Sequence, residues 1–187
     1  MIMKKDVSFV QRLTTSLLAN QAITQKEADS LVAMFHDRAK GKVDKFLLDE
    51  GMVDRETLLK ALGDVYQVPS FDVQGYFFDH ELLHTFSKDV LTSKGIIPLQ
   101  VDEDVLTVVA SNPEDPELLD VIGQTVSYDI QFNVGLYADI IDSIEEYYDD
   151  SSMDVQDEYD DYDDYDDEDD LGDEDDDMGE DIFDDEY

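Results

Sequence analysis

The sequence contains no cysteine among its 187 residues. This absence excludes a disulfide framework, thiolate metal ligands and a cysteine nucleophile. Basic residues are also scarce: 12 Lys and Arg stand against 50 Asp and Glu, which gives a formal net charge of −38. Such a chain is not suited to neutralising a phosphate backbone or an anionic membrane surface. We therefore expect neither a nucleic-acid partner nor direct membrane insertion.

Long hydrophobic runs are absent as well. No stretch of 18 consecutive apolar residues occurs, so no segment is predicted to cross a bilayer. The N-terminus carries two lysines, but Asp6 follows at once and no apolar run of seven appears. This is not the pattern of a secretory signal peptide. The sequence therefore predicts a cytoplasmic protein.

The negative charge is concentrated at the C-terminal end. Residues 149–187 hold 24 Asp and Glu and no Lys or Arg, which leaves 26 acidic and 12 basic residues in residues 1–148. Like charges at the density of the tail repel one another, and almost no aliphatic side chains are present to offset the entropy of ordering. We expect a disordered acidic tail over residues 149–187.

An internal repeat with an offset of 30 residues occupies the first third of the chain. Residues 12–35 align with residues 42–65, and each copy predicts a helix, a short turn and a second helix. The apolar positions coincide in the two copies, as in Leu17 with Leu47 and Ile23 with Val53. Thr24 and Asp54 are placed to cap the second helix of each copy, and Glu27 completes a capping box in the first. Gly51 lies where the first helix of the second copy ends.

After residue 68 the pattern changes. A helix is predicted over residues 80–95, followed by two strands that form a hairpin around residues 102–104, a short helix, a third strand and a closing helix. Helices with a small, mostly antiparallel sheet define an α+β class. The sequence thus predicts a helical hairpin repeat over residues 1–68, a small α+β subdomain over residues 69–148 and the acidic tail.

Two stretches carry a resemblance to a known family. LLDEGMVDRETLLKALGDVYQVPSFDV (residues 47–73) and KGIIPLQVDEDVLTVVASNPEDPELLD (residues 94–120) are similar to the N-terminal domain of type II secretion and type IV pilus assembly ATPases, the GspE/MshE N-terminal family. The likeness extends over roughly residues 8–148. It implies a cytoplasmic domain that contacts other components of a secretion or pilus machine.

The ATPase motor that follows this domain in the family has no counterpart in the sequence. No G-x-x-x-x-G-K-[ST] loop is present, and Gly41-Lys42 lacks the preceding glycine loop that would hold phosphates. We therefore expect a free-standing, non-catalytic adaptor or regulatory module with a protein partner and no cofactor.

The resemblance also raises a second function, because some family members bind cyclic di-GMP through two copies of an R-L-G…G…L-x-x-x-L-x-x-Q motif. Here the motif is degenerate: Thr14 and Asp44 replace its first glycine, and Asp44 places a negative charge where a phosphodiester would approach. The alternative is thus a cyclic di-GMP receptor. The residues that would bind the ligand are Arg12, Leu13, Lys42 and Gly51.

A third possibility comes from HELLH at residues 80–84, which matches the H-E-x-x-H pattern of zinc hydrolases. On a helix, His80 and His84 lie one turn apart, and Glu81 would serve as the base. The extended metzincin pattern does not follow, and no distinctive third ligand stands out. We therefore disfavour His80 and His84 as metal ligands and expect no metal site.

Overall fold

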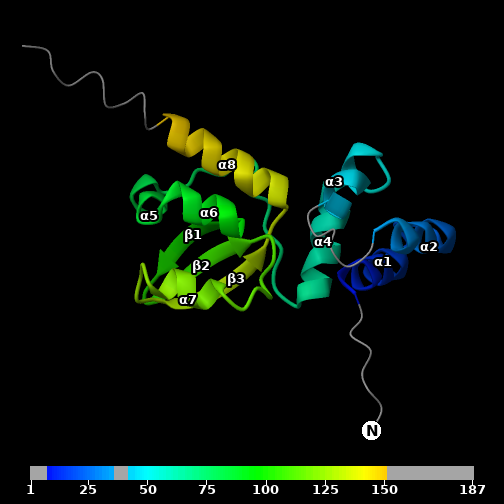
Figure 1. Cartoon of the computed structure of the whole chain (residues 1–187), viewed down its shortest axis with the longest axis horizontal. Helices are drawn as coiled ribbons and strands as arrows, with labels where there is room; N and C mark the ends of the chain where they lie inside the picture. The colour runs from blue at the N-terminus through cyan, green and yellow to red at the C-terminus, as the bar shows by residue number, and fades with distance from the viewer. Residues whose placement is uncertain (1–7, 36–41, 151–187) are drawn as a thin grey trace, which may run out of the picture. The chain divides into compact units, whose positions relative to one another are not determined.

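The computed structural model describes residues 8–35 and 42–150. The first part of the described chain is helical (Figure 1). Its helices are α1 (Phe9–Ala19), α2 (Gln25–Met34), α3 (Lys42–Asp49) and α4 (Arg55–Tyr66). Helices α1 and α2 form one copy of the predicted repeat, and α3 and α4 form the other. The helical hairpin repeat is confirmed.

The N-terminal caps of the second helices are those that the sequence predicts. The Thr24 hydroxyl accepts from the backbone N–H of Glu27, and the Glu27 carboxylate accepts from the backbone N–H of Thr24 at 2.7 Å. In the second copy, the carboxylate of Asp54 accepts from the N–H of Thr57 at 2.8 Å. Each cap satisfies a backbone donor that the helix itself leaves unpaired.

The ends of the two first helices are also equivalent. Gln21 has φ 58° and Gly51 has φ 61°, both in the left-handed region. Their backbone N–H groups donate to Leu18 and Leu48 respectively, each at 3.0 Å. The repeat therefore extends to the turn, and the predicted role of Gly51 at the helix end is confirmed.

The remaining elements combine helices with strands, which confirms the α+β class. They are α5 (His80–His84), α6 (Lys88–Lys94), β1 (Ile96–Asp102), β2 (Val105–Ala110), α7 (Leu118–Gly123), β3 (Asp129–Val134) and α8 (Tyr137–Asp150). The single helix expected over residues 80–95 is two short helices. The break occurs because the Ser87 hydroxyl accepts from the N–H of Val90 and begins α6 as a new helix.

The sheet is mixed, so the expectation of a mostly antiparallel sheet is wrong in this detail. Its strand order is β1-β2-β3, with β1 and β2 antiparallel and β2 and β3 parallel. The parallel pair arises because α7 lies between β2 and β3 in the chain and returns it to the same end of the sheet. Pro98 lies in β1, an edge strand, where the register shifts next to it.

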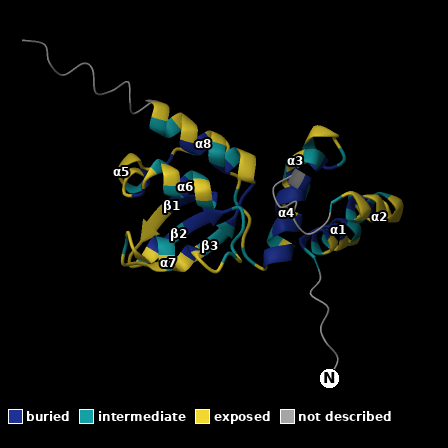
Figure 2. Cartoon of the chain, in the orientation of Figure 1, coloured by how far each residue is buried: buried dark blue, intermediate teal, exposed yellow. Residues whose placement is uncertain are grey.

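Two hydrophobic clusters stabilise the described residues. Buried side chains of α1 to α4 form the first, and the second lies around the sheet, whose central strand β2 is largely buried (Figure 2). Val134 at the end of β3 and Leu136 beyond it belong to the cluster of the helical repeats. The end of β3 is also held through its backbone, because the N–H of Phe71 donates to the carbonyl of Val134 at 2.8 Å.

The predicted tail lies outside the described residues except for its first two positions, since α8 continues to Asp150. The predicted division after residue 68 stays a prediction. Within the described part of the chain, no helix is both long enough and apolar enough to cross a membrane.

Candidate functional site: the face between the first and fourth helices

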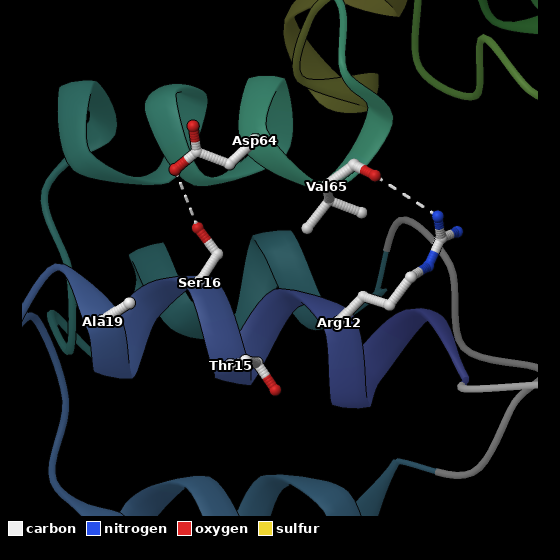
Figure 3. A pocket seen from close by; sticks show the side chains of 6 residues that line it. All are labelled: Arg12, Thr15, Ser16, Ala19, Asp64 and Val65. Carbon is white, nitrogen blue, oxygen red and sulfur yellow. Dashed lines mark hydrogen bonds between the residues drawn. The ribbon is translucent and has the colours of Figure 1, made fainter.

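The helical repeats have a surface hollow of about 630 Å³ between α1 and α4. Successive turns of α1 provide one wall and the C-terminal part of α4 provides the other (Figure 3). The lining residues are Arg12, Thr15, Ser16, Ala19, Asp64 and Val65. The hollow combines small side chains with charged groups at its two ends.

Polar contacts tie the two walls together. The Ser16 hydroxyl donates to the Asp64 carboxylate at 3.0 Å, and the amide of Asn20 donates to the same oxygen at 3.4 Å. At the other end, a guanidinium N–H of Arg12 donates to the carbonyl oxygen of Val65 at 3.3 Å (Figure 3). The carbonyl that Arg12 reaches lies in the last turn of α4, where carbonyls have no partner within the helix.

Arg12 is also paired with a carboxylate from the second half of the chain. Its two terminal nitrogens donate to the two oxygens of Glu114, each at 2.7 Å. This bidentate hydrogen bond raises the pKa of the Arg12 guanidinium above its ordinary value. The partner of Arg12 in this structure is therefore a protein carboxylate, and an anionic ligand at this position would have to displace Glu114.

The structure separates the residues that the degenerate cyclic di-GMP motif would use. Arg12 lies at the hollow, whereas Leu13 is 0% exposed within the core of the helices. Lys42 is the first residue of α3, and Gly51 lies in the exposed turn that follows α3. Their assignment as ligand-binding residues stays a prediction.

His80 and His84 are exposed on α5, a helix of five residues. Their rings stack on each other with centroids 5.0 Å apart, and each ring also contacts a tyrosine of α8, Tyr147 for His80 and Tyr148 for His84. Among residues 8–35 and 42–150, no group of three His, Cys, Asp or Glu has a geometry that could hold a metal ion. The contacts that the structure shows for both histidines are aromatic packing.

The burial of Asp44 is a feature that the cyclic di-GMP motif does not predict. In that motif Asp44 is a misplaced charge, whereas in the structure its side chain is buried, with 8% exposure. Desolvation raises the pKa of the Asp44 carboxyl to about 6. The repeat contains the signal, because Asp44 aligns with the buried Thr14 and lies between the core positions Val43 and Leu47.

Comparison with known proteins agrees with this architecture. The family model described as "MshEN domain" matches residues 66–154. A solved structure of MshE with cdg covers 73% of this chain and 98% of its own, with 16% identity and a TM-score of 0.55. The N-terminal domain of XpsE covers 78% and 97%, with 20% identity and a TM-score of 0.52.

Two curated relatives are much longer than this chain. Bacteriophage adsorption protein B of Escherichia coli strain K12 and bacteriophage N4 adsorption protein B of Escherichia coli O157:H7 are each 22% identical over 144 residues. The match covers 76% of this chain and 19% of each relative. The chain thus spans about a fifth of the length of these relatives.

The fold is similar to that of MshE and of the N-terminal domain of XpsE, and the 187 residues contain no G-x-x-x-x-G-K-[ST] loop. The match to the MshEN domain model, over residues 66–154, thus lies within a chain whose fold is similar to that of these solved structures.

Proposed function

We propose that this chain is a non-catalytic protein-interaction module that acts in the cytoplasm as an adaptor or regulator. The partner that we infer is a component of a secretion or pilus type machine or of its regulation. One observation carries the proposal: an MshEN domain occurs in a sequence that has no phosphate-binding loop for ATP hydrolysis.

The geometry of the hollow between α1 and α4 supports its use as a surface that binds another protein. The charged groups that line it are already paired, Arg12 with Glu114 and Asp64 with Ser16, while Thr15 and Ala19 on the wall formed by α1 are exposed. The polar groups at the edge of this surface resemble the polar rim of protein interfaces.

Photocrosslinking tests this proposal. A photoreactive amino acid at Ala19 in the full-length chain should capture a secretion or pilus component, because Ala19 lines the hollow. The matched control is Glu56, an exposed position at the start of α4. Capture at Ala19 and not at Glu56 supports the proposal, and the absence of any specific product at Ala19 in the cell of origin contradicts it.

A second candidate function is a cyclic di-GMP receptor, because the neighbouring structure of MshE was solved with cdg. Two observations disfavour it as the first choice. Arg12 is hydrogen-bonded to Glu114. In the second copy, Lys42 aligns with Arg12, and the buried carboxyl of Asp44 lies two residues after it.

Calorimetry with cyclic di-GMP distinguishes the two functions. The adaptor proposal predicts no heat of binding at micromolar ligand with the full chain. Micromolar binding that is lost in Arg12→Ala and kept in Lys60→Ala would establish the receptor function instead. Lys60 is an exposed residue of α4 and does not line the hollow.

A further inference from the structure

Asp44 lies in the first turn of α3, where the N–H groups of the helix favour a carboxylate. Its side chain is nevertheless 8% exposed, and its Oδ1 atom has no hydrogen-bond partner among the described residues. An ionised carboxyl that is buried without a partner is costly. The cost falls when a charged donor enters the space beside it.

Such a space is present. Asp44 lines two small hollows, of about 260 Å³ and about 200 Å³, and Tyr137 lines both of them. The larger hollow lies between α3 and the start of α8. Pockets for drug-sized ligands measure about 300–1,000 Å³, so this hollow matches a single side chain.

The charge around the larger hollow is negative. Its other carboxylates are Asp49 of α3 and Asp139 and Asp142 of α8, and its cation is Lys45, which is exposed. Arg55 of α4 pairs with Asp139 at 2.5 Å and partly compensates that charge.

The smaller hollow adds no free cation near Asp44. It contains Tyr66 of α4 and Lys94 of α6, and Lys94 is paired with Asp115 and Glu117. Among the described residues, the charged side chains that line the two hollows thus leave an excess of negative charge.

We propose that the hollow between α3 and α8 takes an arginine side chain of a basic partner protein, with Asp44 as the central acceptor. This inference rests on the proposed function, because it names the chemistry of the partner of an interaction module. The strongly acidic chain, with a formal net charge of −38, attracts a basic partner at long range.

Arginine matches this site better than lysine for three reasons. Its planar guanidinium has five donors, so one group has donors for Asp44 and for a second carboxylate of the same hollow such as Asp142. It stacks on aromatic faces, and Tyr137 is 43% exposed in the wall of the hollow. It is also more weakly hydrated than an ammonium group, which lowers the cost of entering a buried position.

The test is a titration of the full-length chain with N-acetyl-arginine amide, followed by backbone amide NMR shifts. We expect shifts of residues 42–49 and 137–142, with an apparent Kd about fivefold weaker in Asp44→Asn. The matched control is Asp120→Asn, an exposed carboxylate of α7 away from the hollow. This control should keep the wild-type affinity at α3 and α8, because it removes the same charge elsewhere.

The outcomes separate this inference from the proposed function. Equal shifts in wild type and Asp44→Asn, or shifts confined to residues outside α3 and α8, overturn the arginine site. N-acetyl-lysine amide that binds as tightly as the arginine probe overturns the choice of guanidinium. The crosslinking experiment at Ala19 does not depend on this hollow, so the interaction function can survive the loss of the site.

Discussion

Asp44 and Thr14 occupy equivalent positions of the two repeats, and both side chains are buried. The Thr14 hydroxyl donates to the carbonyl of Val10 at 2.8 Å, one turn earlier in its helix. A carboxylate cannot donate in this way, and Asp44 keeps an oxygen without a partner among the described residues. At this position the first copy therefore has a buried polar side chain that is hydrogen-bonded within its own helix, whereas the second copy has one that lacks a hydrogen bond at one oxygen.

This difference predicts a pH-dependent loss of stability from Asp44. Burial raises the pKa of its carboxyl to about 6 from an ordinary value of 3.8, so between these values the folded state binds more protons than the unfolded state. The contribution is fully favourable below pH 3.8 and is lost as the pH rises to about 6. The loss amounts to about 2–3 kcal/mol of unfolding free energy at pH 7.

Denaturant unfolding of wild type and Asp44→Asn at several pH values measures this effect. The free energy of unfolding of the variant relative to wild type should rise by about 2–3 kcal/mol between pH 4 and pH 7. All other carboxylates are common to both proteins and cancel in the difference. A constant difference across this range would show that Asp44 titrates normally.

At the scale of elements, the turns that end α1 and α3 share one geometry with different residues. Gln21 and Gly51 both have positive φ, a conformation that costs a side-chain-bearing residue about 1–2 kcal/mol. The space around a Cβ at Gly51 is empty to 4 Å, so steric contacts do not contribute there. The backbone conformation alone determines the effect of a substitution.

Reciprocal substitutions test this equivalence. Gly51→Ala should lower the free energy of unfolding by about 1 kcal/mol, and Gln21→Gly should raise it by up to about 1 kcal/mol, reduced by the greater freedom of glycine in the unfolded chain. Chemical denaturation gives both values. Stabilisation by Gly51→Ala would contradict the left-handed geometry of this turn.

The end of α6 leads into β1 through Gly95, which is also in the left-handed region. This residue has φ 59°, and a Cβ added to it would lie 2.5 Å from the Ser111 hydroxyl and 3.0 Å from the ring of Tyr137. Here strain and steric overlap act together, unlike at Gly51. The junction therefore tolerates no side chain without movement of its neighbours.

We expect Gly95→Ala to destabilise the protein by about 2 kcal/mol or more. Gly123→Ala is the matched control, because Gly123 lies at the end of α7 with nothing within 4 Å of a new Cβ and without a positive φ. The control should be neutral or stabilising by up to about 1 kcal/mol. Thermal unfolding compares the two, and equal effects would refute the account of the junction.

At the scale of the whole described molecule, two arginines of the helical repeats pair with carboxylates from the second half of the chain. Arg12 binds Glu114, and Arg55 binds Asp72 at 2.9 Å and Asp139 at 2.5 Å. The Asp139 side chain is 16% exposed, and burial raises the pKa of this carboxyl although Arg55 opposes the shift. Removing Arg55 leaves this half-buried charge without its cation.

Arg55→Gln should therefore lower the free energy of unfolding by about 1–2 kcal/mol at pH 7. Lys60→Gln removes a positive charge from an exposed position of the same helix and should change it by less than about 0.5 kcal/mol. Urea denaturation at fixed ionic strength measures both. An equal effect of the two variants would show that the ion pairs of Arg55 contribute only through net charge.

Local sequence signals determined much of this fold. The 30-residue repeat, the caps at Thr24 and Asp54, the turn glycine at Gly51 and the β1–β2 hairpin all depend on residues close together in the chain. These features follow from the hydrophobic period, from hydrogen bonds within one helical turn and from the conformational freedom of glycine. The family resemblance could be detected in the sequence for the same reason, since it rests on the order of these local signals.

Tertiary structure decided what depends on distant neighbours. The parallel pairing of β2 with β3 and the engagement of Arg12 by Glu114 each involve groups far apart in the sequence, and periodicity gives no information on them. For Asp44 the repeat indicates a position on the core side of the helix, but the side chains that enclose its carboxyl come from distant helices. Whether a carboxylate in the first turn of a helix meets water or the side chains of α4, α6 and α8 depends on how those helices pack. The sequence determined which residues carry charge, and the packing of the helices decided which of these charged side chains are buried and desolvated.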